Sequence, residues 1–209
     1  MVCIFIEGKI DEGFLKAFIS HLYIDKEIKE YKIINIGGWT KLKLSANEFV
    51  KNSDEGGSNI VIFDADSQDN GGGKKARESE ILAKKIELGL EFDLFLFPNN
   101  SNDGDIESLL EKIINNKHSC LFDCFQNYLD CIGGYLDRDG NIIYNTNLAR
   151  KSKIFAYIEA LPIDKKNKLD FTHFSNNEYW DLSSEYLNPL KNFLDKHLPI
   201  APMPPEFSI

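Results

Sequence analysis

Short apolar segments alternate with segments of helical periodicity over the first half of the chain. The apolar segments cover residues 2–6, 31–36, 59–64 and 92–97, and the helical ones cover 11–22, 44–50, 78–90 and 105–114. Strands that alternate with helices in this way pair in parallel, with the helices packed on the sheet. The sequence therefore predicts an α/β fold with a mainly parallel central sheet flanked by helices on both faces.

The pattern changes at about residue 117. Helical segments at 121–132, 153–161 and 184–197 surround a turn-rich stretch, in which residues 137–141 are typical of a hairpin turn. We expect an α/β core over residues 1–116 and a C-terminal helical extension over residues 117–209 that packs on the core.

Composition narrows the class of protein. The chain has 209 residues, of which 43% are hydrophobic, enough for a well-packed core. No apolar run approaches the roughly 20 residues of a membrane span, and residues 1–7 lack the basic start of a signal peptide. We therefore expect a cytoplasmic protein with no membrane partner. In a reducing compartment its four cysteines are expected to be small buried hydrophobes: Cys3, Cys120, Cys124 and Cys131.

The net charge of −9 argues against a large DNA-coating surface. It does not exclude an enzyme whose acidic centre is neutralised by bound metal. Two local basic clusters, at Lys74, Lys75 and Arg77 and at Arg150, Lys151 and Lys153, are interpreted as solvated faces.

Two acids directly follow the apolar segment that ends at residue 64. Asp64 and Asp66 are two residues apart, so alternation along an extended strand would point both side chains the same way. Like charges held together repel each other unless a cation lies between them, and hard oxygen ligands suit Mg²⁺, Mn²⁺ or Ca²⁺. The alternative is a solvated acidic loop, because polar residues and glycines follow.

Further acids follow two other expected strands. Glu7 and Asp11 come after the first, and Asp105 and Glu107 come after the fourth. Parallel sheets bind ligands beyond the carboxyl ends of their strands, so these exits are expected to meet at one edge. The alternative is that Asp11, Asp105 and Glu107 only cap helices or complement their dipoles.

These acidic segments, taken in order, resemble the motifs of Toprim domains. Residues 7–15 look like the first motif, Asp64-Ala-Asp66 looks like the second, and residues 97–110 resemble the third motif of OLD-type Toprim nucleases. Small uncharacterised bacterial Toprim-like proteins are similar, and the Toprim effector of the PARIS phage-defence system looks like a distant cousin.

The resemblance implies a two-metal nuclease that uses Mg²⁺ or Mn²⁺ to hydrolyse DNA or RNA. By position, it implies these metal ligands: Glu7, Asp11, Asp64, Asp66, Asp105 and Glu107. It implies a catalytic set of Glu7, Asp64 and Asp66, with Lys153 stabilising phosphate charge. The chain has no Walker motif, so an ATPase partner in phage defence would be a separate protein.

Two other functions stay open at this point. A haloacid-dehalogenase-type phosphatase also places Asp-x-Asp after an apolar strand, although Gln68 stands where threonine or valine is expected. A sensor or scaffold without catalytic activity could keep the same fold, because a fold does not dictate a function.

Overall fold

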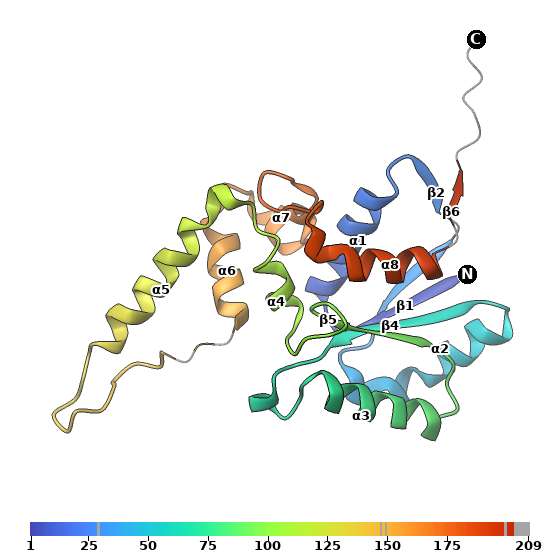
Figure 1. Cartoon of the computed structure of the whole chain (residues 1–209), viewed down its shortest axis with the longest axis horizontal. Coiled ribbons are helices and arrows are strands. Elements are labelled where there is room, and N and C mark those ends of the chain that lie inside the picture. Colours follow the sequence, from blue (N-terminus) through green and yellow to red (C-terminus); the bar gives the residue numbers. More distant parts are fainter. Residues whose placement is uncertain (29, 147, 149, 199, 203–209) are drawn as a thin grey trace, which may run out of the picture.

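A four-stranded parallel sheet forms the centre of the protein in a computed structural model of the chain (Figure 1). The structure describes residues 1–28, 30–146, 148, 150–198 and 200–202. The sheet strands are β1 (Val2–Ile6), β3 (Tyr31–Asn35), β4 (Ser58–Asp64) and β5 (Asp93–Phe97), in the order β3-β1-β4-β5. The predicted α/β class is therefore confirmed, and each of these strands matches its predicted range to within one residue at either end. Residues 203–209 of the predicted extension lie outside the described residues.

Helices cover both faces of the sheet. Helices α1 (Lys9–Leu22) and α8 (Asn188–His197) lie on one side, and α2 (Leu42–Asp54) and α3 (Lys74–Glu87) lie on the other (Figure 1). Alternation along β1 supplies both cores: Ile4 and Ile6 belong to one hydrophobic cluster, and Cys3 and Phe5 belong to the other. Because both faces are covered, β1 and residues 60–63 of β4 are apolar and buried, whereas the edge strand β3 keeps Lys32 exposed.

The order of the strands reverses next to β1. The chain passes from β1 to β3 on one side and then returns to β4 on the other side of β1. In open α/β sheets such a switch point opens a crevice at the carboxyl ends of the two strands. Glu7 follows β1 and Asp64 ends β4, so the sheet topology itself brings these two acids to the same crevice.

The C-terminal half packs largely on the same core. It contains α4 (Ile106–Leu110), α5 (Cys120–Gly133), α6 (Arg150–Ala160), α7 (Lys165–Leu169) and α8. Tyr157, Phe174 and Trp180 join the cluster that holds Ile4 and Phe14. Short 3-10 helices connect the elements of the chain: η1 (Trp39–Lys41), η2 (Gln68–Asn70), η3 (Asn116–His118), η4 (Thr172–Ser175) and η5 (Glu185–Leu187). In the described residues, no helix is long and apolar enough to cross a bilayer.

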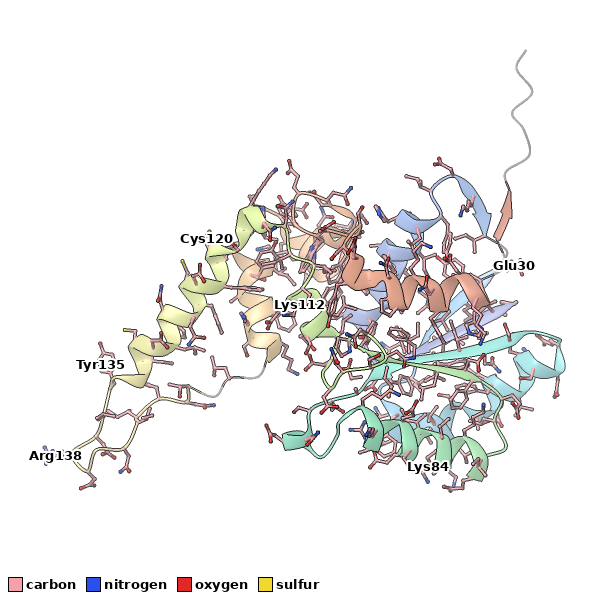
Figure 2. All side chains as sticks on the ribbon, viewed as in Figure 1. Glu30, Lys84, Lys112, Cys120, Tyr135 and Arg138 are labelled. Atoms are coloured by element: carbon pink, nitrogen blue, oxygen red, sulfur yellow. The ribbon has the colours of Figure 1, made fainter. Side chains whose placement is uncertain are left out.

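Helix α5 and the hairpin after it project from the body as an arm (Figures 1 and 2). The predicted turn is present: the backbone N–H groups of Asp139 and Asn141 each donate to Asp137 Oδ1 at 2.9 Å. An antiparallel bridge joins Leu136 to Ile142 across this turn.

Two features differ from the sequence prediction. A small antiparallel pair, β2 (Lys26–Ile28) with β6 (Ile200–Pro202), was not predicted, because its partners are far apart in the chain. The prediction that all four cysteines are buried is wrong. Cys3 is buried, but the three cysteines of α5 are exposed, because α5 packs on the body through another face that includes Leu121 and Phe122.

Candidate functional site

Glu7 and Asp64 meet at the switch point between β1 and β4. Residues of the two strands pair in parallel up to Ile6 and Ile62, so the chain leaves both strands at one level of the sheet. The backbone N–H of Asp64 donates to Glu7 Oε1 at 3.3 Å. Their meeting on one edge agrees with the expected grouping of the strand exits.

Asp11 turns back toward this point from the first turn of α1. Its Oδ2 accepts a hydrogen bond of 2.5 Å from the backbone N–H of Gly8, which is the N-cap residue. Asp11 therefore does cap the helix, as the alternative interpretation holds. Only 4% of its surface is exposed, however. A carboxylate this deeply buried needs more than a helix dipole to compensate its charge.

Helix α4 supplies the remaining acids of the site. Ile106 N–H donates to Asp64 Oδ1 at 2.8 Å, which joins the end of β4 to the start of α4. Asp105 is the N-cap residue of α4 and accepts from Ser108 N–H at 2.8 Å. Glu107 lies in the first turn and is buried.

We call Glu7, Asp11, Asp64, Asp105 and Glu107 the carboxylate cluster, because the charges of the other four all raise the pKa of Asp64. Burial, followed by the charge of Asp66, raises the pKa of Glu7 to about 7. Burial, followed by the charge of Glu7, raises the pKa of Asp11 to about 7, and Glu107 adds to this effect. Burial raises the pKa of Asp64 well above its usual range, and the charges of the other four acids raise it further. The cluster thus resists full ionisation in the absence of a cation.

Asp66 does not follow the alternation that the sequence suggested. Strand β4 ends at Asp64, and Asp66 has a left-handed backbone with φ of 58°. Its Oδ2 instead forms an ion pair of 2.6 Å with Nη2 of Arg77. The expectation that Asp64 and Asp66 point the same way therefore fails, because the extended backbone that it requires stops before Asp66.

Arg77 is the residue of this site that the sequence interpretation missed. Its guanidinium lies 4.7 Å from the ring centre of Trp39 and also pairs with Glu80 at 2.7 Å. Arg77 is buried, so its assignment to a solvated face is wrong. Its charge lowers the pKa of Glu7, a member of the carboxylate cluster. The only sequence signal was an arginine in the first turn of the helix after the Asp-x-Asp segment.

Lys153 lies on α6 and pairs with an acid outside the carboxylate cluster. Its ammonium pairs with Glu111 Oε2 at 3.1 Å and lies 4.3 Å from the ring centre of Phe122. The charge of Lys153 is therefore balanced by Glu111, just beyond α4, rather than by any of the six predicted metal ligands.

The donor chemistry of the cluster suits a hard divalent cation, since every member offers carboxylate oxygen. As the described side chains stand, no group of three or more His, Cys, Asp or Glu residues is arranged to hold a metal ion. A bound ion would therefore require these side chains to rotate inward. The property that favours a bound cation is therefore the concentration of negative charge, and not a preformed coordination shell.

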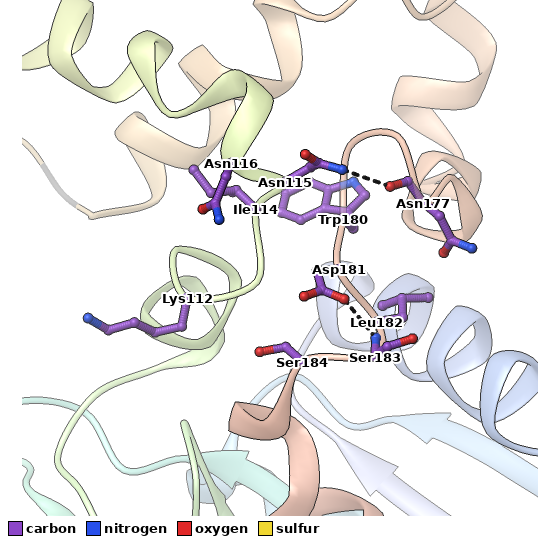
Figure 3. A pocket seen from close by; sticks show the side chains of 10 residues that line it. All are labelled: Lys112, Ile114, Asn115, Asn116, Asn177, Trp180, Asp181, Leu182, Ser183 and Ser184. Carbon is purple, nitrogen blue, oxygen red and sulfur yellow. Dashed lines mark hydrogen bonds between the residues drawn. The ribbon is translucent and has the colours of Figure 1, made fainter.

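A separate polar hollow of 420 Å³ lies between the end of α4 and the segment before η5 (Figure 3). It is lined by Lys112, Ile114, Asn115, Asn116, Asn177, Trp180, Asp181, Leu182, Ser183 and Ser184. Asn115 Nδ2 donates to the carbonyl of Asn177 across it at 3.2 Å. No member of the carboxylate cluster lines this hollow.

Residues 1–198 match the sequence model of a family described as a protein of unknown function, DUF3226. The chain belongs to this family. The matched range contains the whole carboxylate cluster, together with Asp66, Arg77 and Lys153. Comparison with curated proteins and with solved structures gave no match.

Proposed function

We propose that this member of DUF3226 is a Toprim-like, metal-dependent nuclease that hydrolyses nucleic-acid phosphodiesters with Mg²⁺ or Mn²⁺. The observation that carries the proposal is the convergence of five acids, from two strand ends and two helix starts, at the β1/β4 switch point. Structural acids are normally paired with a cation or exposed to water. Glu7, Asp11 and Asp64 are buried in a sheet crevice where neighbouring acids raise their pKa values, and carboxylates in such a place favour a functional site.

The acids of the cluster would bind two metal ions between them. Glu7, Asp11 and Asp64 come from the crevice itself and would hold one ion, whereas Asp105 and Glu107 approach from α4 and would help to hold a second. When bound, such ions activate the attacking water and offset charge on the leaving oxygen. The backbone N–H of Asp64 donates to the Glu7 carboxylate, and the backbone N–H of Ile106 donates to the Asp64 carboxylate. These two hydrogen bonds position both carboxylates before metal binds.

Asp66 and Lys153 would have supporting roles that differ from each other. Asp66 is held by Arg77 and would support the site by fixing the loop after β4. Lys153 pairs with Glu111, and it would offset phosphate charge only after leaving that partner.

The negative charge of the chain affects how it could bind a nucleic-acid substrate. With a net charge of −9, the chain alone would bind a polyanion weakly. We propose that bound metal and a separate ATPase partner supply the positive charge needed to bind nucleic acid. We further propose that the protein acts in phage defence. The resemblance to OLD-type nucleases supports this part of the proposal.

The first test is metal binding. Titrating Mn²⁺ into EDTA-treated protein should release or absorb heat and raise the melting temperature, because an ion that binds only the folded state stabilises it. Asp64→Asn and Glu7→Gln should abolish both effects. Glu12→Gln is the matched control: Glu12 lies beside Asp11 on α1 but pairs with Lys16 at 2.6 Å, outside the cluster.

The second test is cleavage of supercoiled plasmid, single-stranded DNA and total tRNA with Mg²⁺ or Mn²⁺. Wild type and Glu12→Gln should cleave at least one substrate, and Asp64→Asn should not. Metal binding without cleavage, even with the cognate ATPase present, would favour a scaffold without catalytic activity. Absence of any metal-induced heat or stabilisation would contradict the metal site itself.

A further inference from the structure

The projecting arm lacks the buried face that normally stabilises a helix. None of the 14 residues of α5 is buried. The helix contacts the body mainly along one side, where Phe122 packs against the ring of Tyr157 at a centroid distance of 5.6 Å. Helices of this length are marginal without tertiary packing. The rest of the surface of α5 is therefore the place to look for a missing partner.

A second stripe of apolar and thiol side chains runs along the exposed side of α5 and just past its end. It consists of Cys120, Cys124, Tyr128, Cys131 and Tyr135. Successive members are four, four, three and four residues apart, which keeps them on one face of a helix. The stripe contains no charged residue. Two-sided apolar patterning is expected of a helix that is covered on both sides.

The spacing of this stripe is nearly symmetric about Tyr128. Reversing the chain direction brings Tyr128 opposite Tyr128, Cys124 opposite Cys131 and Cys120 opposite Tyr135. Each small thiol at one end would thus meet either a thiol or a tyrosine at the other end. A surface that matches its own reversed copy is what a two-fold interface requires, because both subunits contribute the same patch.

We propose that α5 pairs antiparallel with α5 of a second copy of this chain, around a two-fold axis near Tyr128. The interface is independent of the proposed metal site. It would cover the exposed stripe and place the tip of each arm beyond the N-terminal end of the other copy's α5.

The charges at the two ends of the arm agree with this arrangement. The tip beyond α5 carries Asp137 and Asp139, which are exposed, beside Arg138. Lys117 lies exposed just before the N-terminal end of α5. Antiparallel pairing brings the acidic tip of one copy toward Lys117 of the other, whereas parallel pairing would set the two tips against each other. Complementary charge of this kind fixes the orientation of partners.

The exposed apolar side chains of the arm also offer enough area for a small specific interface. Tyr128, Tyr135 and Tyr144 are each just over half exposed, at 54%, 55% and 52%. Half of a tyrosine surface is about 100 Å², so the three offer about 300 Å² in each copy. The half-exposed aliphatic side chains Leu136, Ile142 and Ile143 add a similar area. Covering the tyrosines and those aliphatic side chains that share their face would bury up to about 1,200 Å² in the two copies, which is the lower end of the range of specific interfaces.

A hollow along the stripe offers room for side chains of the other copy. It measures 550 Å³ and is lined by Tyr128, Cys131, Ile132, Tyr135, Tyr144, Asn145 and Leu148. Tyr128 of a second copy would approach this hollow, because Tyr128 itself lines it and would lie near the two-fold axis.

The first experiment uses charge at the centre of the interface. Wild-type protein should sediment as a dimer at micromolar concentrations. Tyr128→Glu and Tyr128→Lys should each be monomeric, because like charges would face each other, and an equimolar mixture of the two should recover the dimer. Gln126→Glu is the matched control, since it adds the same charge to an exposed position of α5 outside the stripe and should leave the dimer intact. Circular dichroism checks that each variant keeps its helices.

The second experiment tests direction. One variant keeps only Cys124 on α5 (Cys120→Ser with Cys131→Ser), and another keeps only Cys131 (Cys120→Ser with Cys124→Ser). Cys3 is buried and stays in both. With a short bis-maleimide, the mixture should crosslink efficiently and the Cys124-only protein alone should not. A monomeric wild type, a Tyr128→Glu dimer of unchanged affinity, or efficient crosslinking of the Cys124-only protein with itself would each overturn the proposal.

Discussion

Replacing Asp11 by asparagine should stabilise the metal-free protein far more at pH 8 than at pH 5. The asparagine side chain would keep an oxygen that can accept the hydrogen bond from Gly8 N–H, and it would remove the charge. The pKa of Asp11 in the folded protein is about 7, raised from 3.8 by burial and by the charge of Glu7. The substitution therefore isolates the cost of one negative charge in the carboxylate cluster.

The direction follows from proton binding. Between pH 3.8 and about pH 7 the folded state holds a proton on Asp11 that the unfolded state has lost. The free energy of unfolding therefore falls as the pH rises through this window, and the fall is complete above pH 7. From pH 5 to pH 7 the contribution is about 2.7 kcal/mol. For a chain of 209 residues this equals about 6 °C in melting temperature.

The assay is urea or thermal unfolding in EDTA, with wild type and Asp11→Asn compared at each pH. The comparison at equal pH cancels every other titrating group that the substitution leaves unchanged. Asp11→Asn should gain about 3 kcal/mol more at pH 8 than at pH 5. The control Glu12→Gln loses only its ion pair with Lys16, and should change stability by about 0.5 kcal/mol or less at both pH values.

A stability difference that is the same at pH 5 and pH 8 would refute the reasoning, because burial and neighbouring acids would then not disfavour the charge of Asp11. Millimolar Mn²⁺ at pH 8 should narrow the stability difference between the two proteins. Wild type would gain stability from the ion, and Asp11→Asn would gain less.

Three further substitutions test other parts of the structure. Arg77→Met should lower the free energy of unfolding by about 2 kcal/mol in urea titrations, because Asp66 loses its partner, and adding Asp66→Asn should recover part of this loss. Phe14→Ala should cost about 3–5 kcal/mol by the same measurement, because Phe14 is fully buried between α1 and the sheet. Burial and the charge of Lys168 lower the pKa of His173 to about 4, so the unfolded state binds the extra proton between pH 6.5 and pH 4 and stability falls as the pH drops through that window. His173→Gln should remove about 3 kcal/mol of this dependence in unfolding curves measured across that range.

The strands were predictable because their signal is local. The two central strands, β1 and β4, hold short runs of apolar residues bounded by turn or acidic residues, and burial on both faces requires such runs. The helices α1 and α5 were likewise found at nearly their full length from periodicity. The pair β2 and β6 was missed, because three-residue strands carry too little pattern and the two strands lie far apart in the chain.

The grouping of the acids was predictable only in part. The rule that strand exits share an edge correctly brought Glu7 together with Asp64, and the helix starts brought Asp11 to them. The same reasoning placed Asp66 beside Asp64, and there it failed. Whether alternation continues past a strand end depends on the loop that follows, and here Asp66 adopts a left-handed backbone.

The sequence by itself determined which residues form strands and helices and where acids stand relative to them, because these depend on neighbours along the chain. Only the tertiary structure decided that β4 lies beside β1. It likewise decided that Arg77 forms an ion pair with Asp66 and that Lys153 forms one with Glu111. It also decided that one face of α5 packs on the body while its cysteines stay exposed. A helical stripe identifies an apolar face, but what covers that face is set by elements distant in the sequence.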